Sequence, residues 1–152
     1  MSTIMKSTLA AMIALGLSAC GPESQQEAAE DVAEARQEGA EDLADVRQEA
    51  QEEINEAQRD LASADDPEDR SEQRMELRQQ SAEAEYEIAV TQAENRLEVA
   101  QEQCDTLEGD AHDRCDDEAQ MQYENEKQLA EQRLDEAKRN VASSDYDDDF
   151  DQ

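Results

Sequence analysis

The chain has 152 residues, of which 37% are charged, and a formal net charge of -30, but it contains no Trp, one Phe and three Tyr. So few bulky apolar residues cannot build a compact globular core, because their burial would not offset the lost conformational entropy. The charge excludes binding to nucleic acid and to anionic lipid surfaces, since both are negative. Long helices, helices assembled with partners, or partial disorder remain, and such an acidic bias also suits a high-salt habitat.

The N-terminus has the features of a secretory signal peptide. Lys6 supplies a positive charge, and residues 8–17 (TLAAMIALGL) form an apolar run that is too short to span a bilayer but long enough for a signal-peptide core. The residues Leu17-Ser18-Ala19-Cys20 resemble the lipobox of bacterial lipoproteins. This resemblance implies that residues 1–19 are removed and that Cys20 carries diacylglycerol and an amine-linked acyl chain such as palmitate.

The same resemblance implies a location. In that family an Asp after the lipidated Cys retains the protein in the inner membrane, but Gly21 stands at this position. We therefore expect an outer-membrane anchor with the chain in the periplasm, and two or three acyl chains hold a protein there stably. Residues 20–24 would form the lipidated tether. The alternative is an ordinary signal peptide cut after Ala19, which would leave Cys20 free.

Residues 25–64 are predicted to form one acidic helix built on an eleven-residue repeat. Residues 30–40, 41–51 and 52–62 read EDVAEARQEGA, EDLADVRQEAQ and EEINEAQRDLA. Eleven residues in three turns keep the apolar positions on one face, with a slight right-handed drift. This apolar stripe consists of Val32, Ala35, Gly39, Leu43, Val46, Ala50, Ile54, Ala57 and Leu61. Because it is narrow and rich in small residues, it must pack closely against another helix.

The two rims of the stripe carry opposite charges. Arg36 and Arg47 border one side and have no acidic residue three or four positions away, whereas Asp31, Asp42 and Glu53 border the other. A parallel homo-oligomer would set the arginine rim of one helix against the acidic rim of the next. The alternative is that the helix folds back onto the rest of its own chain. A lipid-surface helix of the apolipoprotein type is excluded, because its polar face would carry Lys and Arg.

Residues 67–142 are predicted to form an antiparallel helical hairpin. Asp66 and Pro67 suit the N-cap and first position of its first helix, which we expect to end near Glu108. The seam of this helix is Ala82, Tyr86, Ala89, Ala93, Leu97, Ala100 and Cys104. The seam of the next helix is Cys115, Ala119, Tyr123, Ala130, Leu134, Ala137 and Val141. The two seams meet in a single register, in which facing residue numbers sum to about 219, and this agreement predicts the hairpin.

The turn of the hairpin is expected at Leu107, Gly109 and Asp110. Gly109 fits a left-handed C-cap and Asp110 fits the N-cap of the following helix. The register brings Cys104 opposite Cys115, and the periplasm permits the disulfide that we predict between them. A metal site made by these two cysteines with His112 is the alternative, although it lacks a fourth soft ligand.

The segment CDTLEGDAHDRC resembles a hairpin found in small exported proteins of Gram-negative bacteria. Its pattern is approximately C-x-x-L-x-G-x-A-x-D-x-C followed by an Ala-rich helix. The matching residues are Cys104, Leu107, Gly109, Ala111, Asp113 and Cys115, and the resemblance covers about residues 82–141. It implies the helical hairpin and assigns no activity.

The sequence shows no catalytic constellation. His112 is the only His and is expected to be a solvated turn residue. There is no nucleophile beside a base, no phosphate-binding glycine loop and no zinc signature, so we expect no enzyme activity, no metal and no cofactor beyond the lipid on Cys20. Residues 143–152 (SSDYDDDFDQ) are expected to form a disordered acidic tail.

The sequence therefore predicts an all-α, elongated, coiled-coil-like protein, with a three-helix bundle as one arrangement of its helices. The leading function is a membrane-anchored, periplasm-facing lipoprotein that acts as a structural spacer or interaction scaffold in the cell envelope. Its expected partners are the membrane, through the anchor, and either an envelope protein or a second copy of itself. Two alternatives are an acidic stress or hydration protein with little fixed structure and a low-affinity cation-binding envelope protein.

Overall fold

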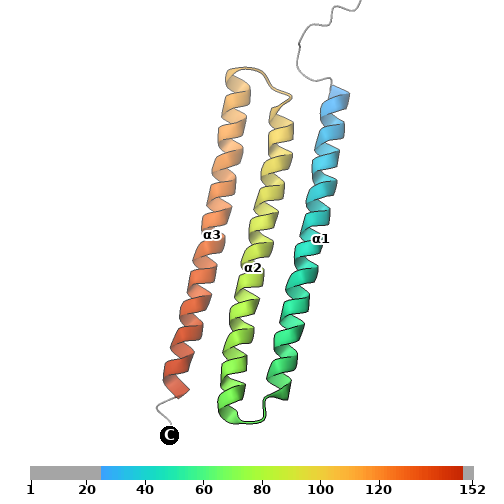
Figure 1. The fold of residues 1–152 in the computed structure, drawn as a ribbon. Helices are drawn as coiled ribbons and strands as arrows, with labels where there is room; N and C mark the ends of the chain where they lie inside the picture. The colour runs from blue at the N-terminus through green and yellow to red at the C-terminus, as the bar shows by residue number, and fades with distance from the viewer. Residues whose placement is uncertain (1–24, 149–152) are drawn as a thin grey trace, which may run out of the picture.

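A computed structural model describes residues 25–148, which form three long helices. They are α1 (Gln25–Ser63), α2 (Pro67–Cys104) and α3 (Asp110–Asp148). Successive helices run antiparallel (Figure 1), and each is about 58 Å long at 1.5 Å per residue. The expected all-α, elongated fold is confirmed. None of the described helices is both long enough and apolar enough to cross a membrane.

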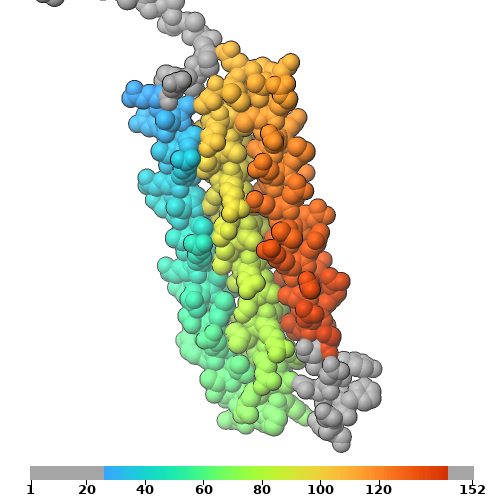
Figure 2. All heavy atoms as spheres, turned by 180° about the vertical axis from the view of Figure 1, so that it is seen from behind, coloured from blue at the N-terminus to red at the C-terminus, as the bar shows by residue number. Residues whose placement is uncertain are grey.

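Helix α2 lies between the other two helices. It packs against α1 on one side and against α3 on the other, whereas α1 and α3 do not pack against each other. Views from the front and from behind both show the three helices side by side (Figures 1 and 2). The helices therefore form an open layer, rather than a closed bundle in which each would touch both others.

The apolar stripe of α1 faces α2. Its small residues Ala35, Gly39 and Ala50 are buried, and the Gly39 carbonyl accepts a hydrogen bond from Asn95 Nδ2 of α2 at 2.5 Å. This contact sets a register in which facing residues of α1 and α2 have numbers that sum to about 134. Of the two packings that the sequence left open, the structure shows α1 folded back onto its own chain.

Helices α2 and α3 form the predicted disulfide-linked hairpin. Cys104 is the last residue of α2, and its bond to Cys115 of α3 brings the two Cα atoms to 5.5 Å. An ion pair joins Arg96 to Glu126 at 2.8 Å, and its residue numbers sum to within three of the expected 219. The pair is exposed and adds little stability, but it confirms the register along the hairpin.

The first helix of the hairpin begins as predicted. Asp66 is its N-cap, and the Asp66 carboxylate accepts a hydrogen bond from the Asp69 backbone N–H at 2.9 Å, with Pro67 in the first helical position. The helix ends at Cys104, earlier than the expected Glu108. Beyond it, the Thr106 hydroxyl donates to the carbonyl of Gln103, a local bond that competes with continued helix.

The C-terminal end of the fold corrects one expectation. Helix α3 continues to Asp148, so residues 143–148 are helical although they were assigned to a disordered tail. This segment contains neither Gly nor Pro, the two residues that most strongly disfavour a helix. The predicted signal peptide (1–19), the predicted lipidated tether with Cys20 (20–24) and residues 149–152 lie outside the described residues.

Candidate functional site

The hairpin turn is the first of two candidate sites. Gly109 adopts a φ of 56°, the left-handed conformation that the sequence predicted and that other residues adopt only with strain. Asp110 is the first residue of α3, so it lies one position inside the helix and not at its N-cap. Leu107 is 42% exposed. The left-handed Gly109 is therefore confirmed, but its role as a C-cap is wrong: Asp105 caps α2, and the Gly109 carbonyl accepts from the Asp113 backbone N–H at the start of α3.

His112 lies near the start of α3 among three aspartates. Its Nε2 is 3.1 Å from Asp105 Oδ1, and its Nδ1 is 3.5 Å from Asp113 and 3.6 Å from Asp116. The hydrogen bond with Asp105 raises the pKa of His112 above its ordinary value, and the negative charge of Asp116 and a hydrogen bond with Asp113 act in the same direction. The side chain of His112 is 32% exposed and lies in the first turn of α3, so its ring is in contact with solvent as well as with these carboxylates.

The hairpin tip does not provide the alternative metal site. Cys104 and Cys115 are bonded to each other, so their sulfur atoms cannot act with His112 as ligands. Across residues 25–148, no group of three or more His, Cys, Asp or Glu side chains is arranged to hold a metal ion. What the tip offers chemically is one titratable imidazole beside a disulfide.

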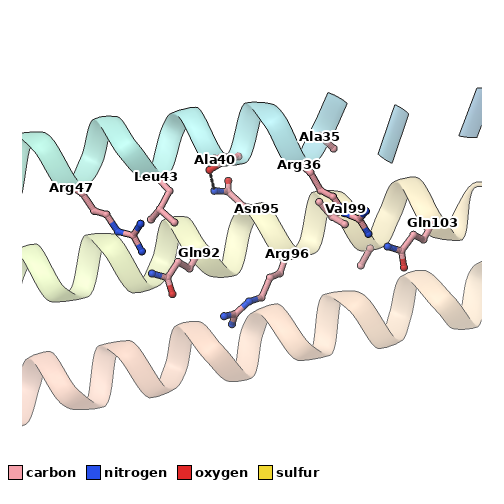
Figure 3. A pocket seen from close by; sticks show the side chains of 12 residues that line it. Ala35, Arg36, Ala40, Leu43, Arg47, Gln92, Asn95, Arg96, Val99 and Gln103 are labelled. Carbon is pink, nitrogen blue, oxygen red and sulfur yellow. Dashed lines mark hydrogen bonds between the residues drawn. The ribbon is translucent and has the colours of Figure 1, made fainter. Parts of the chain in front are cut away.

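The second candidate site is a groove between α1 and α2, with a cavity volume of about 580 Å³ (Figure 3). We call it the α1–α2 groove. Helix α1 lines it with Ala35, Arg36, Gly39, Ala40, Leu43 and Arg47. Helix α2 lines it with Gln92, Asn95, Arg96, Val99, Ala100 and Gln103. Small residues on both helices leave this space open, and not one of the lining residues is acidic.

Arginines border the α1–α2 groove. Arg36 and Arg47 reach from α1 towards α2 across its mouth (Figure 3). Neither has an ion pair among the described residues, whereas Arg96 binds Glu126 of α3. On a chain of net charge -30, this is a local concentration of positive charge. The groove therefore suits an apolar surface that is flanked by acidic groups.

Sequence reasoning did not find the α2 wall of this groove. The positions of α2 that face α1 include Ala84, Ile88, Thr91, Asn95 and Val99, again at spacings of four and three. The spacing was a usable signal, but Thr91 and Asn95 interrupt the apolar pattern. Asn95 is the residue that fixes the closest approach, because its side chain lies directly against Gly39.

Comparisons with family models, curated proteins and solved structures find no match for this chain. Its function is therefore inferred from the residues and the geometry alone.

Proposed function

We propose that this chain is a membrane-anchored lipoprotein of the cell envelope that acts as a structural spacer or interaction scaffold and has no enzyme activity. The observation that carries this proposal is the open helical layer, about 58 Å long, whose first helix begins at Gln25. That start is five residues after Cys20, the site of lipidation in the proposal. A tether this short keeps the base of the layer close to the anchor.

The direction of the helices determines which end of such a spacer lies next to the membrane and which end points away from it. The start of α1 and the α2–α3 turn lie at one end of the layer, while the α1–α2 turn and the end of α3 lie at the other (Figure 1). Anchoring through Cys20 therefore places the disulfide end next to the membrane. The opposite end and the sides of the layer remain for partners.

The charge and the internal constraints support an upright, fixed layer. A chain of net charge -30 is repelled by anionic headgroups, so its helices are not expected to lie flat on the membrane surface. The disulfide, the Asp66 cap and the bond from Asn95 to the Gly39 carbonyl each hold one part of the layer. A hydration protein with little fixed structure would have no use for these features, so they favour the spacer.

The anchor is tested by producing the full chain in a Gram-negative host beside a Cys20→Ala variant. We expect the wild type in the outer-membrane fraction, with mass spectrometry showing an N-terminal peptide that begins at lipid-modified Cys20. The Cys20→Ala variant should lose the lipid and leave that fraction. A Cys104→Ala/Cys115→Ala variant is the matched control and should stay membrane-bound. Wild-type protein that is soluble, with an unmodified Cys20 thiol, would overturn the proposal.

A further inference from the structure

The side of α3 that faces away from α2 packs against no other described helix. Met121 is 57% exposed and Leu129 is 47% exposed, and with Leu107 they are the exposed large apolar side chains of the described residues. On a helical wheel Met121 points directly away from α2, because buried Ala119 and Ala130 occupy the opposite side. We define the α3 outer edge as Met121, Asn125, Gln128, Leu129 and Gln132. All five are exposed and none is charged.

The α3 outer edge and the α1–α2 groove lie at the same height in the layer. The numbers of facing residues sum to about 134 between α1 and α2, and to about 219 between α2 and α3. Residues of α1 and α3 that are level therefore differ by about 85 in number. Arg36 is level with Met121, and Ala40 is level with Asn125. A second molecule with its long axis parallel and its ends at the same height, turned about that axis so that its α3 outer edge faces the groove, would bring this edge to the middle of the groove.

The two surfaces also complement each other in chemistry. The groove has an apolar floor and a positive rim, in which Arg36 and Arg47 are about 17 Å apart along α1. When the two long axes are parallel and at the same height, Arg36 comes level with residues between Glu118 and Glu124, and Arg47 comes level with residues around Glu131. The apolar side chains of the α3 outer edge would therefore contact the apolar floor of the groove, and the carboxylates beside them would lie near the arginines of its rim.

We propose that the α1–α2 groove binds the α3 outer edge of a second copy of this chain, with the two chains parallel and side by side. The chain's own α3 cannot fill the groove, because α2 separates it from α1. The open, elongated shape suits a helix laid lengthwise better than a small molecule, which a site normally encloses on most sides. The proposal does not depend on the lipid anchor, although chains anchored at their N-termini would meet in this orientation.

This interface is heterologous, since a groove on one chain meets an edge on the other, and such contacts continue from chain to chain. That property gives a sharp test by sedimentation velocity on the purified full chain in about 0.15 M salt, where repulsion beyond about 8 Å is screened. We expect concentration-dependent association of the wild type. Met121→Asp damages only the edge, and Arg36→Glu/Arg47→Glu damages only the groove. Each should raise the dissociation constant about tenfold or more, since both lie at the centre of the contact.

Mixing the two damaged variants should restore a dimer and nothing larger, because each supplies the surface that the other lacks. The matched controls are Leu107→Asp, which removes an exposed apolar side chain at the turn, and Arg59→Glu, which reverses a charge on α1 outside the groove; both should associate as the wild type does. A wild-type monomer up to millimolar concentration would overturn the proposal. So would an association that the two variants leave unchanged, or one that the controls weaken equally.

Cross-linking tests the parallel register separately. In a Cys20→Ser background, a chain with Ala40→Cys is mixed with a chain with Asn125→Cys, two positions that are level in the proposed pair. Oxidation should link these chains to each other. The control partner is Arg139→Cys, which lies on the same side of α3 but about 21 Å along the helix. Equal linkage of Ala40→Cys to both partners, or linkage to Arg139→Cys alone, would overturn the parallel arrangement.

Discussion

Replacing Gly39 by Ala probes the closest contact between α1 and α2. A Cβ atom at residue 39 would lie 2.7 Å from Asn95 Cγ and 2.9 Å from Asn95 Cβ, distances that real Cβ atoms essentially never show. A new rotamer could move Asn95 Cγ, but Asn95 Cβ is fixed to the backbone of α2. The helices must therefore separate slightly, and the hydrogen bond from Asn95 to the Gly39 carbonyl is lost.

The expected change in the free energy of unfolding is a balance of three effects. Ala is favoured over Gly inside a helix by about 1 kcal/mol. Overpacking at a close contact costs about 1–3 kcal/mol, and a lost hydrogen bond costs about 0.5–1.5 kcal/mol. The unfavourable effects win, so Gly39→Ala should destabilise the protein by roughly 2 kcal/mol, even though the substitution favours the isolated helix.

Urea denaturation followed by circular dichroism measures this change. Ala33→Gly, at an exposed position of α1, is the control for helix propensity alone and should cost about 1 kcal/mol. In an Asn95→Ala background the hydrogen bond and the Cγ contact are already gone, so Gly39→Ala should cost less there by about 0.5–2 kcal/mol. A stabilisation of about 1 kcal/mol by Gly39→Ala alone would refute the close approach.

Three further substitutions have defined outcomes. Asp105 raises the pKa of His112 in the folded protein, so the protonated His112 side chain stabilises the fold. This stabilisation is complete below the pKa of unfolded His, about 6.5, and is lost as the pH rises through the higher pKa of the folded state. His112→Gln should therefore lower the urea midpoint more at pH 5.5 than at pH 8.5, and an equal effect at both would contradict the linkage. Removing the disulfide with Cys104→Ser/Cys115→Ser should cost about 2–3 kcal/mol; an unchanged thermal midpoint would show that the bond constrains little. Gln80 buries an unsatisfied carbonyl oxygen, so Gln80→Leu should stabilise by about 1 kcal/mol, and a loss of stability in the same assay would show that this oxygen is satisfied.

The hairpin was predictable because several independent signals agree in it. Asp66 and Pro67 mark a helix start, Gly109 marks the turn, and Cys104 and Cys115 fall at nearly equal distances from that turn. Each of these signals involves residues that are close in sequence or that face each other across a single turn. The sequence alone is therefore sufficient to predict the hairpin. The end of α3 was missed because the alternation of Asp with aromatic residues has no helical period, although nothing in residues 143–148 interrupts a helix.

The packing of α1 and the α1–α2 groove could not be derived in the same way. The apolar stripe of α1 shows that a partner helix is needed but does not select one. The choice of α2 depends on the fit between Gly39 and Asn95, a polar contact that apolar periodicity does not reveal. The isolated charges of Arg36 and Arg47 were visible in the sequence, but their place on the rim of a groove requires the position of α2.

The open layer, in which α2 separates α1 from α3, is the basis of the proposed spacer role and of the proposed binding of a second copy. It is tested most directly by double electron–electron resonance between spin labels at Gln51→Cys on α1 and Glu136→Cys on α3, in protein diluted with unlabelled chain. Two successive helix contacts place the axes of α1 and α3 about 16–20 Å apart, and we expect a label separation consistent with that value. A separation consistent with helix axes about 8–10 Å apart would show a closed bundle and contradict the open layer.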